Sequence, residues 1–344
     1  MRSLKPFTLL ACACAAGVSF IASAVQDAPT TGVARLKVEA AALQSLGKTD
    51  VSREFLDAVA NLPSIQPREL HRDKATGQWL SSAEVAALPE EKRDQVQTRT
   101  ADESVYYNTK YGSPLAYARP LEILGQNDLK SLTGKRILDI GYGTIGHLRM
   151  MASCGGHAIG LDVDPFLTAL YSDPSDQGIV QGRPGVEGSV KLVNGRFSEE
   201  KVNAVVGNGF DLIFSKNTLK RGYIHPPPEE NVDKRMLVDL GLNDKEFVQT
   251  LFDLLKPGGA ALIYNLSPKP AGPGEKYIPW ADGRCPFDRE LLEQTGFKVV
   301  QYDANDDAAA RAMAHALGWD QGEHPMNLET DLFAHYTLLM KPAK

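Results

Sequence analysis

The sequence predicts an α/β protein with a doubly wound, mostly parallel sheet, preceded by a helical accessory region. Short apolar runs rich in Val, Ile and Leu alternate with segments of helical periodicity over the second two-thirds of the chain, as in strands joined by crossover helices. In addition, residues 136–164 read as strand, glycine-rich turn, helix and second strand, ending in an acid. This is one complete unit of such a sheet.

The composition narrows the class of protein. The chain has 344 residues, of which 43% are hydrophobic and 23% charged, as in an ordinary globular protein. Its net charge of −6 argues against nucleic acid as a partner, because binding to phosphates needs a basic surface. Outside the N-terminal apolar segment the cysteines are Cys154 and Cys285, which form neither a disulfide framework nor a metal-type pair.

The N-terminus has the features of a secretory signal peptide. Arg2 and Lys5 precede an uncharged run over 7–21, and Ala22-Ser23-Ala24 forms an A-x-A cleavage pattern. We therefore expect residues 1–24 to be removed and the protein to be exported, either to a periplasm or out of the cell. Two alternatives stay open: an uncleaved segment that anchors the chain to a membrane, and a lipoprotein signal ending at Cys12.

Residues 25–105 are expected to form the accessory region. Helical periodicity runs over 33–62, with a break at Gly47 and a restart at Asp50, while 64–100 is polar and irregular except for a short helix over 82–87. The aromatic run 106–114 then begins the main domain, which extends to residue 344. This run either packs the accessory helices on the sheet or forms a lid over a ligand.

The main domain is predicted to contain seven strands and the helices between them. The segment 172–189 is rich in Gly, Pro, Ser and Asp and is expected to be a loop, and 222–242 is an insertion. Asn243 and Glu246 have the spacing of a capping box that begins a helix. The predicted strands are 137–140, 158–161, 190–193, 210–215, 260–264, 297–302 and 332–340.

The glycine turn after the first of these strands indicates a site for an adenosine-containing cofactor. Gly141 and Gly143 allow a sharp turn and a close approach of the ligand to the backbone, and Asp162 ends the next strand, where its carboxylate can accept hydrogen bonds from ribose hydroxyls. With Gly146, the turn also has the spacing of the dinucleotide fingerprint. However, Asp139 lies inside the corner, and a carboxylate there disfavours a pyrophosphate and favours a cationic amino-acid group.

At this point the chain resembles the class I S-adenosylmethionine-dependent methyltransferases. The resemblance rests on LDIGYGTIG, GLDVD, FDLIFS and LLKPGG in that order, and it covers about residues 106–342. It implies a seven-stranded sheet of order 3-2-1-4-5-7-6 with an antiparallel seventh strand. It also implies S-adenosylmethionine as the cofactor and a small molecule or a protein as the methyl acceptor.

The resemblance assigns cofactor contacts to four places along the chain: the glycine turn, the end of the second strand, the start of the loop after the third, and the end of the fourth. The family's usual acid after the third strand is absent, and Arg196 stands near its place. Ser215, Lys216 and Asn217 are expected to face the methyl donor or acceptor. The implied cofactor-binding residues are Asp139, Gly141, Tyr142, Gly143, Gly146, Asp162, Val163, Gly195, Arg196, Phe197 and Ser215.

The candidate catalytic residues follow the fourth strand. They are Asn217, Tyr223 and His225, of which the last two could remove a proton from a hydroxyl acceptor. Three functions stay open: a methyltransferase, an inactive methyltransferase-like binding module in the cell envelope, and an NAD(P)-dependent oxidoreductase. The sequence has no run of His, Asp and Glu with metal-ligand spacing, so no metal site is expected.

Overall fold

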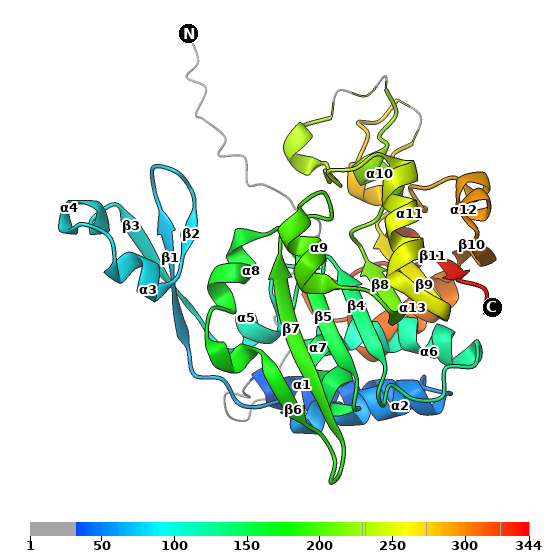
Figure 1. Cartoon of the computed structure of the whole chain (residues 1–344), viewed down its shortest axis with the longest axis horizontal. Coiled ribbons are helices and arrows are strands. Elements are labelled where there is room, and N and C mark those ends of the chain that lie inside the picture. The colour runs from blue at the N-terminus through cyan, green and yellow to red at the C-terminus, as the bar shows by residue number, and fades with distance from the viewer. Residues whose placement is uncertain (1–31, 229, 231, 273, 324, 344) are drawn as a thin grey trace.

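The computed structural model describes residues 32–343 except 229, 231, 273 and 324. The predicted signal peptide therefore lies outside the described residues, and its cleavage stays a prediction. No helix in the described part of the chain is both long and apolar enough to cross a bilayer. The described elements form a large central sheet covered by helices, with a smaller sheet at one side (Figure 1).

The central sheet has the predicted strand order. Its neighbours run β10-β11-β9-β8-β4-β5-β7-β6, and without β6 this is the expected order 3-2-1-4-5-7-6. β11 pairs antiparallel with both β9 and β10, whereas β5, β4, β8 and β9 are parallel neighbours. The strands are β4 (Arg136–Ile140), β5 (His157–Asp162), β6 (Gly178–Gln181), β7 (Glu187–Asn194), β8 (Phe210–Lys216), β9 (Leu255–Ser267), β10 (Lys298–Asn305) and β11 (Phe333–Met340).

β6 is an eighth strand in this sheet that the sequence pattern did not predict. It pairs antiparallel with β7 from Gly178 opposite Val190 to Gln181 opposite Glu187, within the segment expected to be a loop. Three of its four residues are exposed, so it lacks the apolar alternation by which a half-buried strand is identified. β6 is therefore held at the edge of the sheet by its hydrogen-bonded pairing with β7 and not by burial of its side chains.

Helices cover both faces of the sheet because side chains along each strand alternate between the faces. One face, with Ile137, packs on α1, α2, α6, α7 and α13. The opposite face, with Leu138, packs on α9, α11 and α12. The helices of the main domain are α6 (Ala118–Gln126), α7 (Gly146–Ser153), α8 (Pro165–Leu170), α9 (Glu200–Val206), α10 (Arg221–Ile224), α11 (Asp244–Leu254), α12 (Arg289–Thr295), α13 (Asp307–Ala316) and α14 (Leu328–Asp331), with short 3-10 turns η3 (Pro174–Asp176), η4 (Lys234–Met236) and η5 (Pro279–Ala281). The capping box predicted for α11 is present.

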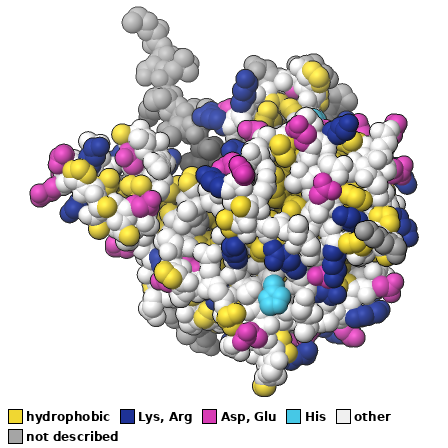
Figure 2. Space-filling model, viewed as in Figure 1, with side chains coloured by type: hydrophobic (Ala, Val, Ile, Leu, Met, Phe, Trp, Pro, Cys, Tyr) yellow, Lys and Arg dark blue, Asp and Glu magenta, His cyan; other side chains and the backbone are white. Residues whose placement is uncertain are grey.

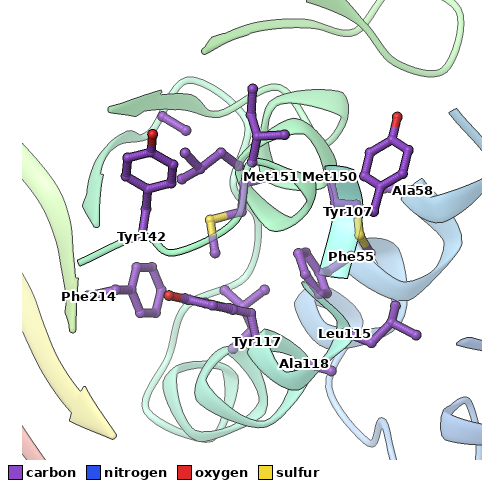
Figure 3. Close-up of a cluster of buried hydrophobic side chains, with 14 of the residues drawn as sticks. Phe55, Ala58, Tyr107, Leu115, Tyr117, Ala118, Tyr142, Met150, Met151 and Phe214 are labelled. Carbon is purple, nitrogen blue, oxygen red and sulfur yellow. The ribbon is translucent and has the colours of Figure 1, made fainter. Parts of the chain in front are cut away.

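The accessory helices share one hydrophobic core with the sheet. α1 (Gly32–Leu43), α2 (Asp50–Asp57) and the 3-10 turn η1 (Ala58–Asn61) agree with the predicted periodicity and its break. Leu36 and Phe55 are fully buried in the same cluster as Met150 of α7. Figure 3 shows Phe55 and Ala58, from the adjoining α2 and η1, in one buried cluster with Met150 and Tyr117 from two other segments. The accessory helices therefore support the face of the sheet that carries Asp139.

The region expected to be irregular contains a small antiparallel sheet, so that expectation was wrong. β1 (Arg68–Asp73) lies between β2 (Trp79–Leu80) and β3 (Val96–Ala101), with α3 (Ser82–Ala86) and α4 (Glu90–Arg93) beside them. Four of six residues in β3 are exposed, and charges of both signs cover this projecting lobe (Figures 1 and 2). Its strands carry too few apolar side chains for a recognisable pattern. The predicted short helix is present as α3, capped by Ser81.

Candidate functional site

The glycine turn after β4 is closely packed by side chains from two other segments. Gly141 and Gly143 have φ of +75° and +58°, values that favour glycine. A Cβ on Gly141 would lie 2.0 Å from Thr218 Oγ1, and a Cβ on Gly143 would lie 2.7 Å from Tyr111 Cβ. The turn therefore needs glycine for both its conformation and its contacts. Gly146 begins α7 and packs against Pro114.

Asp139 lies fully buried beneath this turn, with its two carboxylate oxygens in different environments. Oδ2 accepts hydrogen bonds from Tyr117 Oη at 2.7 Å and from His147 Nε2 at 2.5 Å. Among the described residues, Oδ1 has no hydrogen-bond partner. The Tyr117 ring stacks on the imidazole of His147, with 3.6 Å between centroids, and Figure 3 shows Tyr117 pointing towards Phe214 of β8. A buried acceptor without a donor is costly, so Oδ1 is suited to a donor group on a ligand.

His147 is the neutral partner in this cluster. Burial lowers the pKa of His147, although Asp139 acts to raise it. The imidazole is then neutral, and the Nε2–Oδ2 distance assigns its proton to Nε2. His147 and Tyr117 therefore hold Asp139 by two donated hydrogen bonds and leave its second oxygen free to act on a ligand.

Asp162 joins the end of β5 to the glycine turn. Its Oδ1 accepts from the backbone N–H groups of Val163 and Asp164, and its Oδ2 accepts from Gly143 N at 3.2 Å. Burial raises the pKa of Asp162 to about 6, although the N–H groups of Asp164 and Gly143 act to lower it. A carboxylate has about four acceptor positions, so acceptor capacity remains for a ligand hydroxyl.

The segment that joins α5 (Glu103–Asn108) to the 3-10 turn η2 (Pro114–Tyr117) is bonded to the glycine turn. Thr109 Oγ1 donates to Gly143 O at 2.8 Å, and Tyr111 Oη donates to Asp164 Oδ2 at 2.6 Å. Burial acts to raise the pKa of Asp164, but Lys110 and Tyr111 lower it below its usual value. We call Thr109–Tyr111 the strap. α5 packs on the core, as the first interpretation of the aromatic run expects, and the strap packs against the glycine turn. Its role as a lid over a ligand stays a prediction.

Of the three residues predicted to contact the cofactor after β7, one lies at the candidate site and two have side chains that contact other parts of the protein. Gly195 lies at the site, because its N–H donates to Asp162 O at 3.0 Å. The Arg196 side chain turns away to the insertion, where Nε donates to Asp239 O at 3.0 Å. Phe197 is buried in the core against Phe247 of α11. Gly195 therefore contributes backbone to the site, whereas Arg196 and Phe197 contact other parts of the protein.

Two further predicted residues are held by local contacts. The Tyr142 ring is buried in the core beside Gly160 and Tyr171, so only its backbone belongs to the turn. Val163 is 47% exposed immediately after Asp162. Its N–H donates to the Asp162 carboxylate. Both residues contribute backbone to the site. The side chain of Tyr142 points into the core, and the side chain of Val163 is exposed to solvent.

The end of β8 brings a hydroxyl, an amine and an amide to the edge of the sheet. Ser215 Oγ accepts from Leu219 N at 3.2 Å. Asn217 has a φ of +63°, and its Oδ1 accepts from Leu266 N at 2.7 Å, which extends the pairing of β8 with β9. The Lys216 side chain lies with its ammonium 5.7 Å from the centre of the Tyr117 ring. Asn217 is thus a structural residue here, and Lys216 is the group that faces the Asp139 cluster.

The two other candidate catalytic residues lie in the segment around α10. Tyr223 packs its ring near Lys220, whose Nζ donates to the carbonyls of Leu266 and Trp280. His225 pairs with Asp244 at 2.8 Å between Nε2 and Oδ2. That pair lines an open pocket of about 630 Å³ between the insertion and α11. The structure therefore separates His225 from the glycine turn, whereas Tyr223 lies near the strap: burial chiefly raises the pKa of Tyr111, and Asp164, Asp162 and Tyr223 add to that shift.

The structure adds site residues that the motifs did not indicate. Tyr117 and Thr218 contact Asp139 and Gly141, respectively, but neither belongs to a recognisable pattern. The aromatic run did indicate Tyr111. Among the described residues, no group of three or more His, Cys, Asp or Glu side chains has a geometry that could hold a metal ion.

The comparisons with known proteins find likeness in solved structures alone. No family model and no curated protein matches the sequence. The [4+2]-cyclase SpnF is 17% identical, with a TM-score of 0.41 over 67% of this chain and 83% of its own. The phosphoethanolamine N-methyltransferase 2 of Haemonchus contortus is 12% identical, with a TM-score of 0.40 over 85% of this chain and 75% of its own. An arsenic(III) S-adenosylmethionine methyltransferase of Chlamydomonas reinhardtii is 15% identical, with a TM-score of 0.32 over 62% and 64%. At these values no activity or substrate is transferred from them.

Proposed function

We propose that this protein is an S-adenosylmethionine-dependent methyltransferase that acts on a small molecule or a protein. The observation that supports this most is Asp139, a buried carboxylate directly beneath the glycine turn with one oxygen that has no hydrogen-bond partner among the described residues. A cationic amino group is the natural donor to that oxygen, whereas an anionic pyrophosphate would be repelled by it. The strand order, with antiparallel β11 between β9 and β10, agrees with this proposal.

The residues present fit such a cofactor at both ends. Asp139 would receive the amino-acid portion, and the backbone of Gly141 and Gly143 would allow its close approach. Asp162 would accept hydrogen bonds from the ribose hydroxyls, since three backbone N–H groups already orient it. Gly195, bonded to the backbone of Asp162, would lie beside the adenine. The strap would cover the turn and exclude water.

The bound cofactor would supply an electrophilic methyl group on a sulfonium. The chain's contribution is then mainly positioning and the exclusion of water, which account for much of the rate in such a displacement. The buried rings of Tyr117 and Phe214 give the floor of the site a low polarity. Charged groups interact more strongly in such surroundings than in water.

A second candidate function is a methyltransferase-like binding module without activity. Arg196 is the observation that favours it, because the family's usual adenine-side acid is replaced by a residue that contacts Asp239 of the insertion. An oxidoreductase is disfavoured by Asp139. All three functions differ in the ligands that they predict, so a binding measurement separates them.

The test is a thermal-shift comparison of the purified protein with S-adenosylhomocysteine and with NAD. A ligand at one hundred times its Kd stabilises by about 2.7 kcal/mol, which raises Tm by roughly 4 °C for a chain of this size. We expect this shift with S-adenosylhomocysteine alone. Asp162→Ala should remove it without unfolding the protein, and Asp94→Ala, an exposed acid in the projecting lobe, should retain it. A shift with NAD alone would overturn the proposal, and a shift with neither ligand would favour the binding module.

We also propose that the protein is exported, to a periplasm or out of the cell, on the basis of the signal-like N-terminus. Cell fractionation with mass measurement of the mature N-terminus tests this. A chain that begins at Val25 in the exported fraction supports cleavage. A full-length chain in the membrane fraction would support the retained anchor instead.

A further inference from the structure

Lys216 ends β8 on the face of the sheet that carries Asp139. Asp139 pairs with Phe214 across β4 and β8, and side chains two residues apart along a strand share a face. Lys216 therefore projects from the same face as Phe214, one strand from Asp139. It is the last residue of β8, at the edge where the glycine turn begins.

The surroundings of this amine come from four elements. Tyr117 of η2 presents its ring to the ammonium at 5.7 Å, and Asp139 of β4 and His147 of α7 are electrostatically coupled to it. Tyr264 is its cross-strand partner on β9 and bonds through its hydroxyl to Asp306. The Lys216 ammonium has no hydrogen bond or ion pair with any described residue, whereas the buried Lys220 ammonium donates to two carbonyls.

A partly buried amine with these neighbours is poised to exchange a proton. Burial lowers the pKa of Lys216 to about 8, although Asp139 acts to raise it. Its ammonium has the ring face of Tyr117 and the charge of Asp139 to stabilise it. A ligand amino group that bonds to Asp139 Oδ1 would compete for this charge, and a ligand cation nearby would disfavour the ammonium further.

We propose that Lys216 is the general base of the site, and that it releases its proton when a sulfonium cofactor binds. This inference rests on the proposed function and deepens it. The neutral amine then serves an acceptor whose nucleophilic oxygen, sulfur or nitrogen carries a proton. The acceptor atom forms a bond to the methyl carbon, the carbon–sulfur electron pair stays on sulfur, and the acceptor's proton moves to Lys216 Nζ.

This assignment replaces His225 as the base. His225 is paired with Asp244 in the pocket beside α11, whereas Lys216 lies against the Asp139 cluster. A general base typically contributes 10²–10⁴-fold to a rate, and it must lie close to the reacting atoms.

The test measures protons released on binding, so it needs no identified acceptor. S-adenosylmethionine and S-adenosylhomocysteine are titrated into the full protein at pH 7.5 by calorimetry, in two buffers that differ in ionisation enthalpy. The two ligands share their amino, carboxylate and adenosine groups and differ by the sulfonium methyl and its charge. We expect the sulfonium ligand to release more protons, by roughly half a proton or more.

Variants assign that difference to one residue. Lys216→Met removes the titrating amine at similar length, and Lys216→Arg keeps a charge that is not lost at any working pH. Both should bind S-adenosylhomocysteine and lose the difference in proton release, whereas the exposed control Lys130→Gln should retain it. An equal release for the two ligands in the unsubstituted protein, or a difference that persists in both Lys216 variants, would overturn the inference and leave the proposed function standing. Failure of both ligands to bind the unsubstituted protein would overturn the proposed function itself.

Discussion

The two halves of the candidate site differ in how their side chains are held. In the half around the glycine turn, which we call the donor half because the proposed function assigns the methyl donor to it, Asp162 is oriented by the N–H groups of Val163, Asp164 and Gly143. In the half that follows β8, Asn217 is bonded to Leu266, almost fifty residues further along the chain. The Asp162 carboxylate is thus oriented by backbone N–H groups within twenty residues of it, whereas Asn217 is bonded to a more distant strand.

This difference shows which part of the site can be recognised from the sequence and which part depends on distant segments of the fold. A turn built from glycines and local N–H groups can be recognised by spacing alone, and it specifies a ligand common to many reactions. The segment after β8 depends on β9 and on η5, which supply the partners of Asn217 and Lys220. Substrate choice is expected to depend on that second half.

The largest effect is expected from Gly141→Ala in the donor half. An alanine there meets Thr218 Oγ1 at 2.0 Å in a backbone conformation that disfavours a Cβ. We expect a loss of about 2–4 kcal/mol in the free energy of unfolding, from the strain and the overlap together. S-adenosylhomocysteine binding should become undetectable. Chemical denaturation and calorimetry measure the two effects.

Gly134→Ala is the matched control for this substitution. Gly134 has a similar φ of +68°, but no atom lies within 4 Å of an added Cβ. It should cost about 1 kcal/mol from backbone strain alone and leave ligand binding intact. Equal losses for the two variants would show that the close approach of Thr218 is unimportant, and the donor half would then be less tightly defined than the distances indicate.

The second effect is a pH dependence that belongs to Asp162. Its pKa is raised to about 6, so the free carboxylate becomes protonated as the pH falls from 7 to 5. The ionised form accepts hydrogen bonds from ribose hydroxyls more strongly, and we therefore expect S-adenosylhomocysteine affinity to fall about tenfold over this range. Binding curves at pH 5, 6 and 7 measure it.

Asp162→Asn tests whether that titration belongs to this residue. The amide cannot ionise, so its affinity should be low at pH 7 and should vary little between pH 7 and 5. The stability of the unliganded protein changes with pH in the opposite direction to ligand affinity. Because the native pKa is raised, the native state binds more protons than the unfolded state between about pH 4 and 6. The free energy of unfolding therefore falls as the pH rises through that range. A pH profile of the Asn variant identical to that of the unsubstituted protein would remove Asp162 from this role.

The sequence predicted the fold and the backbone of the glycine turn well because both rest on local patterns, whereas the cofactor contacts assigned to that turn stay a prediction. Apolar runs located β4, β5, β7 and β8 along the chain, the resemblance implied their order in the sheet, and the capping box at Asn243 marked the start of α11. β6 and the sheet of β1, β2 and β3 were not predicted, because exposed strands carry no apolar alternation. Their pairing depends on partners elsewhere in the chain.

Side-chain direction was the part of the site that sequence could not predict. Phe197 follows β7 in the position of an adenine contact, yet its ring is buried against Phe247. Tyr142 lies inside the glycine turn, yet its ring packs beside Tyr171. A motif specifies where the backbone runs, whereas the packing of α11 and α8 decides which way these aromatic rings turn.

A smaller effect is expected from the strap. Tyr111→Phe removes the hydrogen bond from Oη to Asp164 but keeps the ring over Gly143. A hydrogen bond to a charged group contributes about 1.5–3 kcal/mol, reduced here because Lys110 also pairs with Asp164. We expect a three- to tenfold loss of S-adenosylhomocysteine affinity, measured by calorimetry. Unchanged affinity would show that the strap packs the fold and does not cover the ligand.

The smallest effect is expected from His225→Ala in the half that follows β8. Its imidazole pairs with Asp244 where both side chains are about one-third or more exposed, and such ion pairs contribute about 0–1 kcal/mol. We expect a change of less than twofold in S-adenosylhomocysteine affinity and of about 0.5 kcal/mol or less in the free energy of unfolding. A tenfold loss of affinity would place His225 at the cofactor and show that both halves of the site take part in cofactor binding. A small effect, set beside a large one for Gly141→Ala, would show that cofactor binding depends on the donor half alone.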